Sequence, residues 1–307
     1  MCKLFMMSGI NDDNRSDASD LIIEMAGIIG LSMRDGIGYA AVTTDGDLFG
    51  ERWFKSEDAF DLREEPSVSK DEQYILDQYK DALTLIDKPK KYNTFGDEKK
   101  SIAELWGNVS AVTLHGRFAT SAKEFRNTHP FIVNDTSLVH NGVIRNAFSL
   151  NRMKQSSCDS EVILNLYDEM LVSETPANIQ AVVDNLIGYY ACGVFARDSE
   201  GNRVLDIFKD QTANLSAAYI DELGVVVFVT NIDDLKRACD VLDLTIGSVY
   251  KVNSGILMRL NPVDGSVITM KHFNTSEGKG ISVWDRRVIN DVDADGFAVD
   301  LDKVLGL

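Results

Sequence analysis

The order in which strand-like and helix-like segments follow one another constrains the fold of this chain more than any other feature of its sequence. Strand-like segments form two blocks, one in the first half of the chain and one after residue 188, and helix-like segments between residues 159 and 187 separate them. Alternating βαβ units would instead mix the two kinds of segment along the whole chain. The grouping therefore predicts a layered α+β domain.

The expected elements lie where apolar residues alternate, as in strands, or recur at helical spacing. In the first half of the chain we expect a strand at Cys2–Met7, a helix at Ser19–Leu31 with Ser16 or Ser19 as its cap, a hairpin of Gly38–Thr43 and Leu48–Phe54 around Asp45-Gly46, and strands at Val109–Leu114 and Ser137–His140. In the second half we expect helices at Asp159–Val172, Ile179–Ile187 and Asp233–Leu242, strands at Tyr189–Ala196, Arg203–Phe208, Ala217–Ile220 and Val225–Thr230, and a hairpin that turns at Asn261–Gly265.

Two stretches differ in composition from the rest of the chain. Residues 55–100 are polar, with one helical period at Tyr74–Ile86, and predict a surface elaboration. Residues 271–307 are rich in Asp and predict an acidic C-terminal extension to a domain that spans residues 1–270.

The chain is acidic, because 48 Asp and Glu outnumber 31 Lys and Arg among its 307 residues, for a formal net charge of −17. A surface of this charge repels phosphate backbones and anionic lipid heads, so we expect no nucleic acid and no membrane as a partner. The four cysteines form no C-x-x-C pair, which favours a reducing compartment, the cytoplasm. The sequence also lacks an apolar run of about 18 residues, the length that a transmembrane helix needs. The apolar patch Leu4–Met7 is too short for a signal peptide.

Cys2 is the first residue that could carry chemistry. A methionine before a residue as small as Cys is normally trimmed, which would leave Cys2 with a free α-amino group. Such an amine has an ordinary pKa of about 7.7 to 8.0, suited to a general base at neutral pH, so one residue could hold both nucleophile and base. The alternative is a buried thiol at the start of a strand.

Four further motifs follow in order: His115-Gly116-Arg117-Phe118-Ala119-Thr120, Asn127-Thr128-His129-Pro130, His140-Asn141-Gly142 and Cys158-Asp159-Ser160-Glu161. Together with an N-terminal Cys, they resemble the glutaminase domain of the class II glutamine amidotransferases, a branch of the N-terminal nucleophile hydrolases. The family's usual forms are H-T-R-[WY]-A-T, N-x-H-P, H-N-G and [TS]-D-[ST]-E. Arg34–Val42 and Gly188-Tyr189-Tyr190-Ala191 also stand where the family has related segments. The resemblance covers roughly residues 2 to 270 and implies a four-layer αββα sandwich of the N-terminal nucleophile hydrolase type.

The resemblance implies a role for each motif. Cys2 would attack the carboxamide of glutamine, and the Asn141 side chain and Gly142 backbone N–H would stabilise the oxyanion. Arg117 would hold the α-carboxylate of glutamine, and Asp159 its α-ammonium. From the residues alone, other interpretations stay open: Asn141-Gly142 as a type I′ turn, Asp159 as a helix N-cap, and Arg117 in a surface ion pair.

The remaining matched positions carry less defined roles. Phe118, Thr120 and His129 match positions that line the glutamine pocket, whereas His115 and His140 are interpreted as orienting or packing residues. The chain departs from the family at Gly116, where Thr is usual, and at Cys158, where Thr or Ser is usual. We interpret Cys158, Cys192 and Cys239 as structural thiols.

We expect no cofactor, because the four histidines show no metal-ligand spacing with carboxylates. A separate calcium hypothesis concerns the acidic end, where a D-x-D-x-D-G opening resembles a calcium loop. Its ligands would be Asp291, Asp293, Asp295, Phe297 and Asp302. A solvated or partner-docking tail is the alternative.

The sequence therefore predicts a glutaminase that releases ammonia from glutamine through a thioester on Cys2. We expect it to be a standalone module, because no ammonia-using domain fits after residue 271 and no G-x-x-x-x-G-K-[ST] phosphate loop is present. Its ammonia would then pass to a separate synthase subunit. The sequence leaves open whether the chain forms a homo-oligomer. The alternatives are a catalytically degenerate scaffold or regulatory subunit, and a hydrolase of another γ-glutamyl amide.

Overall fold

A computed structural model describes residues 2–33, 35–54, 105–118, 127–150, 156–171 and 179–275. Within this part of the chain the strands form two sheets, and every pair of neighbouring strands is antiparallel. The seven-stranded sheet has the order β11 (Ile246–Lys251), β9 (Ser216–Ile220), β10 (Val225–Val229), β1 (Lys3–Ser8), β4 (Val109–Arg117), β2 (Gly36–Thr43) and β3 (Leu48–Phe54). The six-stranded sheet has the order β13 (Val267–His272), β12 (Ile256–Leu260), β8 (Arg203–Lys209), β7 (Gly188–Arg197), β6 (Thr136–Ile144) and β5 (Phe131–Val133).

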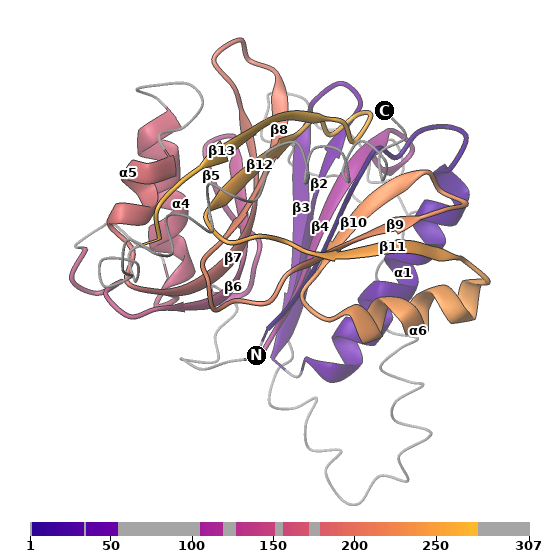
Figure 1. Cartoon of the computed structure of the whole chain (residues 1–307), viewed down its shortest axis with the longest axis horizontal. Coiled ribbons are helices and arrows are strands. Elements are labelled where there is room, and N and C mark those ends of the chain that lie inside the picture. Colours follow the sequence, from indigo (N-terminus) through magenta and orange to yellow (C-terminus); the bar gives the residue numbers. More distant parts are fainter. Residues whose placement is uncertain are drawn as a thin grey trace, which may run out of the picture.

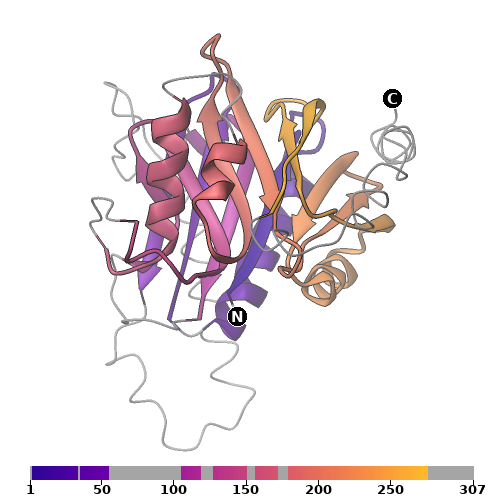
Figure 2. The same cartoon turned by 60° about the vertical axis from the view of Figure 1, so that its left-hand side comes forward.

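Helices cover the outer side of each sheet, as Figure 1 shows. The helices α1 (Arg15–Ser32) and α6 (Ile232–Leu242) contact each other, and α1 packs on β2 and β4 of the seven-stranded sheet. On the opposite side of the molecule, α4 (Ser160–Leu171) packs on β5 and β6 and on α5 (Ile179–Asp184). Figure 2 shows the same arrangement from a second direction. None of the helices in the described ranges combines the length and the apolar character that a membrane crossing needs.

Three clusters of buried side chains hold these elements together. One lies between the seven-stranded sheet and α1 and α6, and a second lies between the six-stranded sheet and α4 and α5. The third contains Met6 of β1, Ala40 of β2 and Val139 of β6, and it fills the space between the two sheets. A strand that faces an apolar layer on both sides is buried along its whole length, as the pattern of β4 shows.

The order of elements and the two hairpins of the sequence analysis are confirmed, with several corrections. The helix α1 begins at Arg15, and its N-cap residue is Asn14 rather than Ser16 or Ser19. The Asn14 side chain donates to the carbonyls of Gly9 and Leu223, so contacts distant in the sequence fix the start of the helix. The strand β4 continues to Arg117 and β6 continues to Ile144, because their neighbours in the sheets extend the hydrogen-bond ladders past the polar residues.

Two strands were not predicted, and some expected segments cannot be compared. The strand β5 has three residues, and β11 follows α6 with a mixed burial pattern, so neither carries a clear alternation. The expected boundary at residue 270 falls within β13, which runs to His272. The expected elaboration at 55–100 with its helix at Tyr74–Ile86, and the residues of the acidic extension after 275, lie outside the described residues.

Candidate active site

Cys2 lies directly before β1, which pairs with β10 on one side and β4 on the other. The register places Lys3 opposite Gly116, so Cys2 lies beside the end of β4, where Arg117 is the last strand residue and Phe118 follows it. The Phe118 N–H donates to Cys2 Sγ at 3.4 Å, and the thiol donates to the Phe118 carbonyl at 3.7 Å. A half-buried thiol is thus held at the end of a central strand.

The groups around this thiol shift its pKa in opposite directions. Burial raises the pKa of Cys2, whereas the hydrogen bond from the Phe118 backbone and the charge of Arg117 lower it, and Asp159 raises it further. Burial therefore dominates, and the thiol is protonated at neutral pH. A base next to Sγ is needed before the sulfur can act as a nucleophile.

Arg117 ends β4 and pairs with Gly36 of β2. The side chain is almost fully buried, with an exposed fraction of 3%. Its charge lowers the pKa of both Cys2 and Cys158. An exposed surface ion pair, the alternative interpretation of Arg117, does not agree with this burial.

Asn141 and Gly142 lie inside β6, opposite Ala191 and Tyr190 of β7. The alternative of a type I′ turn is therefore wrong. A Cβ on Gly142 would lie 2.0 Å from the Tyr189 carbonyl oxygen and 2.6 Å from His140 Nε2, so only glycine fits this close approach of two strands. Because β6 contacts β1 and β4 across the space between the sheets, these two residues come from the sheet that faces the one carrying Cys2.

Asp159 directly precedes α4, but its carboxylate is bound to β6. Its Oδ2 accepts a hydrogen bond of 2.6 Å from the backbone N–H of Ile144, and its Oδ1 lies 3.6 Å from Cys158 Sγ. Asp159 thus ties the start of α4 to the strand that carries Asn141. Burial raises the pKa of Cys158 to about 11, and the Asp159 charge acts in the same direction, which agrees with a structural thiol.

The segment around His129 is held by contacts on both sides. The Asn127 side chain and Ser157 exchange two hydrogen bonds, of 2.8 and 3.0 Å, and Arg52 Nη1 donates to the Thr128 carbonyl at 3.0 Å. A Cβ on Gly38 would lie 2.1 Å from the His129 carbonyl oxygen, so glycine lets this segment approach β2. Asn127, Thr128 and His129 belong to one of the motifs, whereas the contacts that Arg52 and Ser157 make with this segment become visible only in the folded chain.

Three buried histidines, His115, His129 and His140, lie together beside these residues. The ring centroids of His115 and His129 are 3.8 Å apart, and those of His129 and His140 are 6.4 Å apart. Burial lowers the pKa of His115 to about 3 and also lowers the pKa of His129 and His140, so all three imidazoles are neutral at pH 7. Within the described ranges, no group of three His, Cys, Asp or Glu side chains is arranged to hold a metal ion.

Gly116, the first departure from the motif, has a structural reason. A Cβ at this position would lie 2.2 Å from Ile29 Cγ2 and 2.6 Å from Met33 Cγ, at the end of α1. The helix therefore packs so closely on β4 that a threonine does not fit without movement. The glycine leaves the backbone of β4 in register with β1 and β2.

The structure brings Cys2, Arg117, Phe118 and Asp159 together, with Asn141, Gly142 and His129 on neighbouring segments. Phe118 meets the thiol through its backbone, while its side chain is exposed. The remaining expected site residues lie outside the described part of the chain: Thr120, Asp291, Asp293, Asp295, Phe297 and Asp302.

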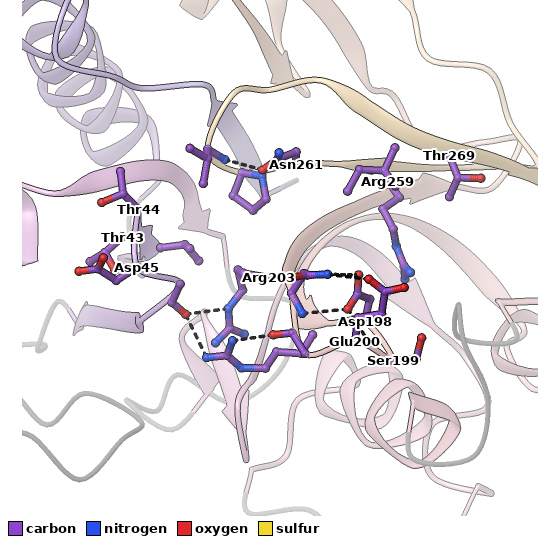
Figure 3. A pocket seen from close by; sticks show the side chains of 18 of the residues that line it. Thr43, Thr44, Asp45, Asp198, Ser199, Glu200, Arg203, Arg259, Asn261 and Thr269 are labelled. Carbon is purple, nitrogen blue, oxygen red and sulfur yellow. Dashed lines mark hydrogen bonds between the residues drawn. The ribbon is translucent and has the colours of Figure 1, made fainter.

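A cavity of about 820 Å³ lies elsewhere, at the opposite end of the strands (Figure 3). Its lining includes Thr43, the last residue of β2, and Pro262. The Pro262 carbonyl accepts a hydrogen bond from the N–H of Gly9, which follows β1. Arg197 and Arg203 line it, and their guanidinium groups are paired with the Asp135 carboxylate and the Gly46 carbonyl. Cys2 and the residues grouped around it do not line this cavity.

Comparisons with known proteins show the fold. No family model and no curated protein matches the sequence. Among solved structures, the chain is similar to glutamine phosphoribosylpyrophosphate amidotransferase from B. subtilis complexed with ADP and GMP, at 16% identity and a TM-score of 0.51. It is similar to the same extent to a structure described as the allosteric regulatory enzyme of purine biosynthesis. In both cases the match covers 88% of this chain but 49% of the other, so the chain spans about half the length of these relatives.

Proposed function

We propose that this protein is a glutamine amidohydrolase of the class II amidotransferase type, with the four-layer αββα sandwich of the N-terminal nucleophile hydrolases. The observation that carries the proposal is the placement of Cys2 at the end of a central strand, in contact with Phe118, where the charges of Arg117 and Asp159 act on the pKa of its thiol. The similarity in fold to an amidotransferase supports it. In the proposed site, residues from four separate parts of the sequence act together with the Cys2 thiol.

The proposed reaction begins when the α-amino group of Cys2, freed by removal of Met1, takes the proton of the thiol. The thiolate forms an S–C bond to the carboxamide carbon of glutamine, and the carbonyl oxygen becomes an oxyanion. The Asn141 side-chain amide and the Gly142 N–H would donate to that oxygen. As the tetrahedral intermediate collapses, the C–N bond breaks, and the amine returns a proton so that ammonia leaves.

Water then completes the cycle. It attacks the thioester carbon, the S–C bond breaks, the sulfur regains a proton and glutamate is released. During both steps Arg117 would hold the α-carboxylate in a two-point contact and the Asp159 carboxylate would accept from the α-ammonium. The hydrogen bond from Ile144 to Asp159 Oδ2 fixes the orientation of that carboxylate. A substrate with a free amino-acid head group fits this pair of opposite charges.

The test is glutamate release from glutamine by protein that begins at Cys2. The Cys2→Ala variant should lose at least about 10³-fold in rate, because it removes the nucleophile. The matched control is Cys239→Ala, in α6, which should retain the rate of the unmodified protein. Equal rates for Cys2→Ala and the unmodified protein would reject the proposal. Glutamine binding without turnover in the processed protein would instead favour the degenerate scaffold.

We further propose that the ammonia passes to a separate synthase. The proposed module spans residues 1–270, with the acidic extension after it, and works in the cytoplasm. Co-purification with the processed protein, in the presence of a glutamine analogue that alkylates Cys2, would identify such a synthase. A rate of glutamine hydrolysis that does not change in the presence of the captured protein would contradict the coupling.

A further inference from the structure

Three of the four histidines of the chain are buried close to one another, and each lies on a different segment. His115 lies in β4 two residues before Arg117, His140 lies in β6 directly before Asn141, and His129 precedes β5. The fourth, His272, lies in β13 and is exposed. The reaction proposed above assigns no proton transfer to any of these side chains.

A hydrogen bond between the two sheets joins the first two of these histidines. His115 Nε2 lies 3.0 Å from the His140 carbonyl oxygen. A carbonyl can only accept, so the hydrogen of the His115 ring is on Nε2. The accepting carbonyl belongs to the peptide unit that joins His140 to Asn141. The bond therefore fixes that peptide relative to β4, whose last residue precedes the Phe118 N–H that contacts Cys2 Sγ.

A second pair of bonds joins β6 to the start of α4. His140 Nδ1 lies 2.8 Å from Ser160 Oγ, and Asp159 Oδ2 accepts from the Ile144 N–H at 2.6 Å. These contacts lie on either side of Asn141 and Gly142 in the sequence. They fix the Asp159 carboxylate and the Asn141–Gly142 pair relative to each other.

Packing limits the movement of these rings. The His129 ring packs against that of His115 in a tilted arrangement, with an interplanar angle of 30°, and meets Phe131 edge-on at 4.6 Å between ring centroids. All three histidine side chains are buried. A ring that is buried and packed against another ring keeps its hydrogen bond in one direction, whereas a flexible polar side chain does not.

We propose that His115 and His140 are positioning residues, which hold the oxyanion donors of β6 and the Asp159 carboxylate in register with the Cys2 thiol. The inference rests on the proposed glutaminase function. His115 acts on the oxyanion donors through the His140 peptide, so it influences the chemical step. The contact between His140 and Ser160 acts on Asp159, so it influences the binding of glutamine.

Substitutions at His115 separate a hydrogen-bond role from simple packing. The amide nitrogen of Gln reaches about as far as Nε2 of His, whereas that of Asn corresponds to Nδ1, and Phe keeps the ring without a donor. We expect His115→Asn and His115→Phe to lower kcat by about 10- to 100-fold with little change in KM, and His115→Gln to restore most of kcat. Ser160→Ala should instead raise KM by about 3- to 10-fold. His272→Gln and His272→Phe are the matched controls on the exposed histidine.

Either of two results would overturn the positioning role of His115. Folded His115→Asn and His115→Phe proteins with the kcat of the unmodified enzyme would overturn it. A loss of kcat in His115→Gln equal to that in His115→Phe would also overturn it, since packing alone would then be sufficient.

A spectroscopic measurement does not depend on turnover. Long-range ¹H–¹⁵N spectra of the processed protein should show His115 as the neutral Nε2–H tautomer, and the His140 signals should shift in His115→Gln. An Nδ1–H tautomer at His115 would overturn the positioning role. Absence of glutamine hydrolysis in a protein with the expected tautomer would reject the proposed function and leave the hydrogen bond between the sheets as a structural one.

Discussion

The two sheets are joined by one kind of contact at the end that carries Cys2 and by another kind at the opposite end. At the end opposite Cys2, Arg203 donates to the Gly46 carbonyl at 3.1 Å and to both the backbone carbonyl and the carboxylate of Asp135, at 2.7 and 2.6 Å. Gly46 belongs to the turn between β2 and β3, and Asp135 belongs to the turn between β5 and β6. We call this group of three residues the arginine clasp, because it joins a turn of each sheet.

At the end that carries Cys2, one hydrogen bond from a neutral imidazole joins β4 to β6. Several buried polar atoms there have no hydrogen-bond partner within the described part of the chain: His115 Nδ1, Thr128 Oγ1, and both ring nitrogens of His129. Buried polar groups are normally paired, and unpaired ones lower stability. We therefore expect the clasp end to supply stability, and the cysteine end to hold the polar groups that the proposed function uses.

The largest expected effect that tests this comparison is at Asn141. Removal of one oxyanion donor in Asn141→Ala should lower kcat by about 10² to 10³-fold. The free energy of unfolding should change little, because the neighbouring ladder of β6 and β7 stays intact. Steady-state kinetics and urea unfolding of the same preparation measure both quantities. A loss of stability as large as the loss of activity would contradict a division of roles between the two ends.

At the clasp end the pattern should be reversed. Asp135→Ala removes the carboxylate that pairs with the buried guanidinium of Arg203, and we expect a loss of about 2 kcal/mol in the free energy of unfolding. The kcat for glutamine should stay within twofold of the unmodified protein. Urea unfolding and glutamate release measure the two effects. A tenfold fall in kcat without a loss of stability would show that the clasp acts on the site.

Gly116→Thr introduces the residue that is usual in the motif. The new side chain would clash with Ile29 and Met33, where α1 packs on β4. Overpacking of this kind lowers the free energy of unfolding by about 1 to 3 kcal/mol. The double variant Gly116→Thr with Ile29→Ala should recover part of the loss, as thermal unfolding would show. A stable Gly116→Thr protein would mean that α1 moves easily and does not constrain the cysteine end.

The smallest expected effect is a dependence of stability on pH. The pKa of His115 is about 3 in the folded chain against 6.5 in its ordinary state, and His129 and His140 are lowered in the same direction. Between these values the unfolded chain binds more protons than the folded one, so the free energy of unfolding should fall as the pH drops from 6.5 towards 3. His115→Gln should make this dependence less steep, whereas His272→Gln should not. Urea unfolding at pH 7.5, 6 and 5 tests this dependence. If the free energy of unfolding changes equally with pH in both variants, the three buried histidines are not held neutral as described.

Two dipeptides with glycine show which parts of the fold could be predicted from the sequence. Asp45-Gly46 forms the predicted turn of a hairpin, with φ of 82° at Gly46, because the information for that turn is local. Asn141-Gly142 could have formed a similar turn, but β7 pairs along it and the Tyr189 carbonyl approaches Gly142 closely. Contacts with a distant strand decide its structure, and no local pattern contains them.

The same distinction applies to the candidate site. Cys2, Arg117 and Asp159 could be selected from the motifs, since each carries a chemical group that the proposed reaction needs. The contacts that orient them could not, because the bonds from Ile144 to Asp159 and from His115 to the His140 carbonyl join residues that are 15 and 25 positions apart on different elements. Side-chain chemistry can be predicted from the sequence, but its orientation depends on tertiary packing.

Alkylation of the processed protein by an electrophilic analogue of glutamine, followed by peptide mass spectrometry, tests the central claim most directly. The reagent forms a covalent S–C bond only with a thiol that a glutamine-shaped ligand can reach. We predict one adduct per chain, located on Cys2, which free glutamine prevents from forming. An adduct on Cys158, or labelling of Cys2 that glutamine does not slow, would contradict the account.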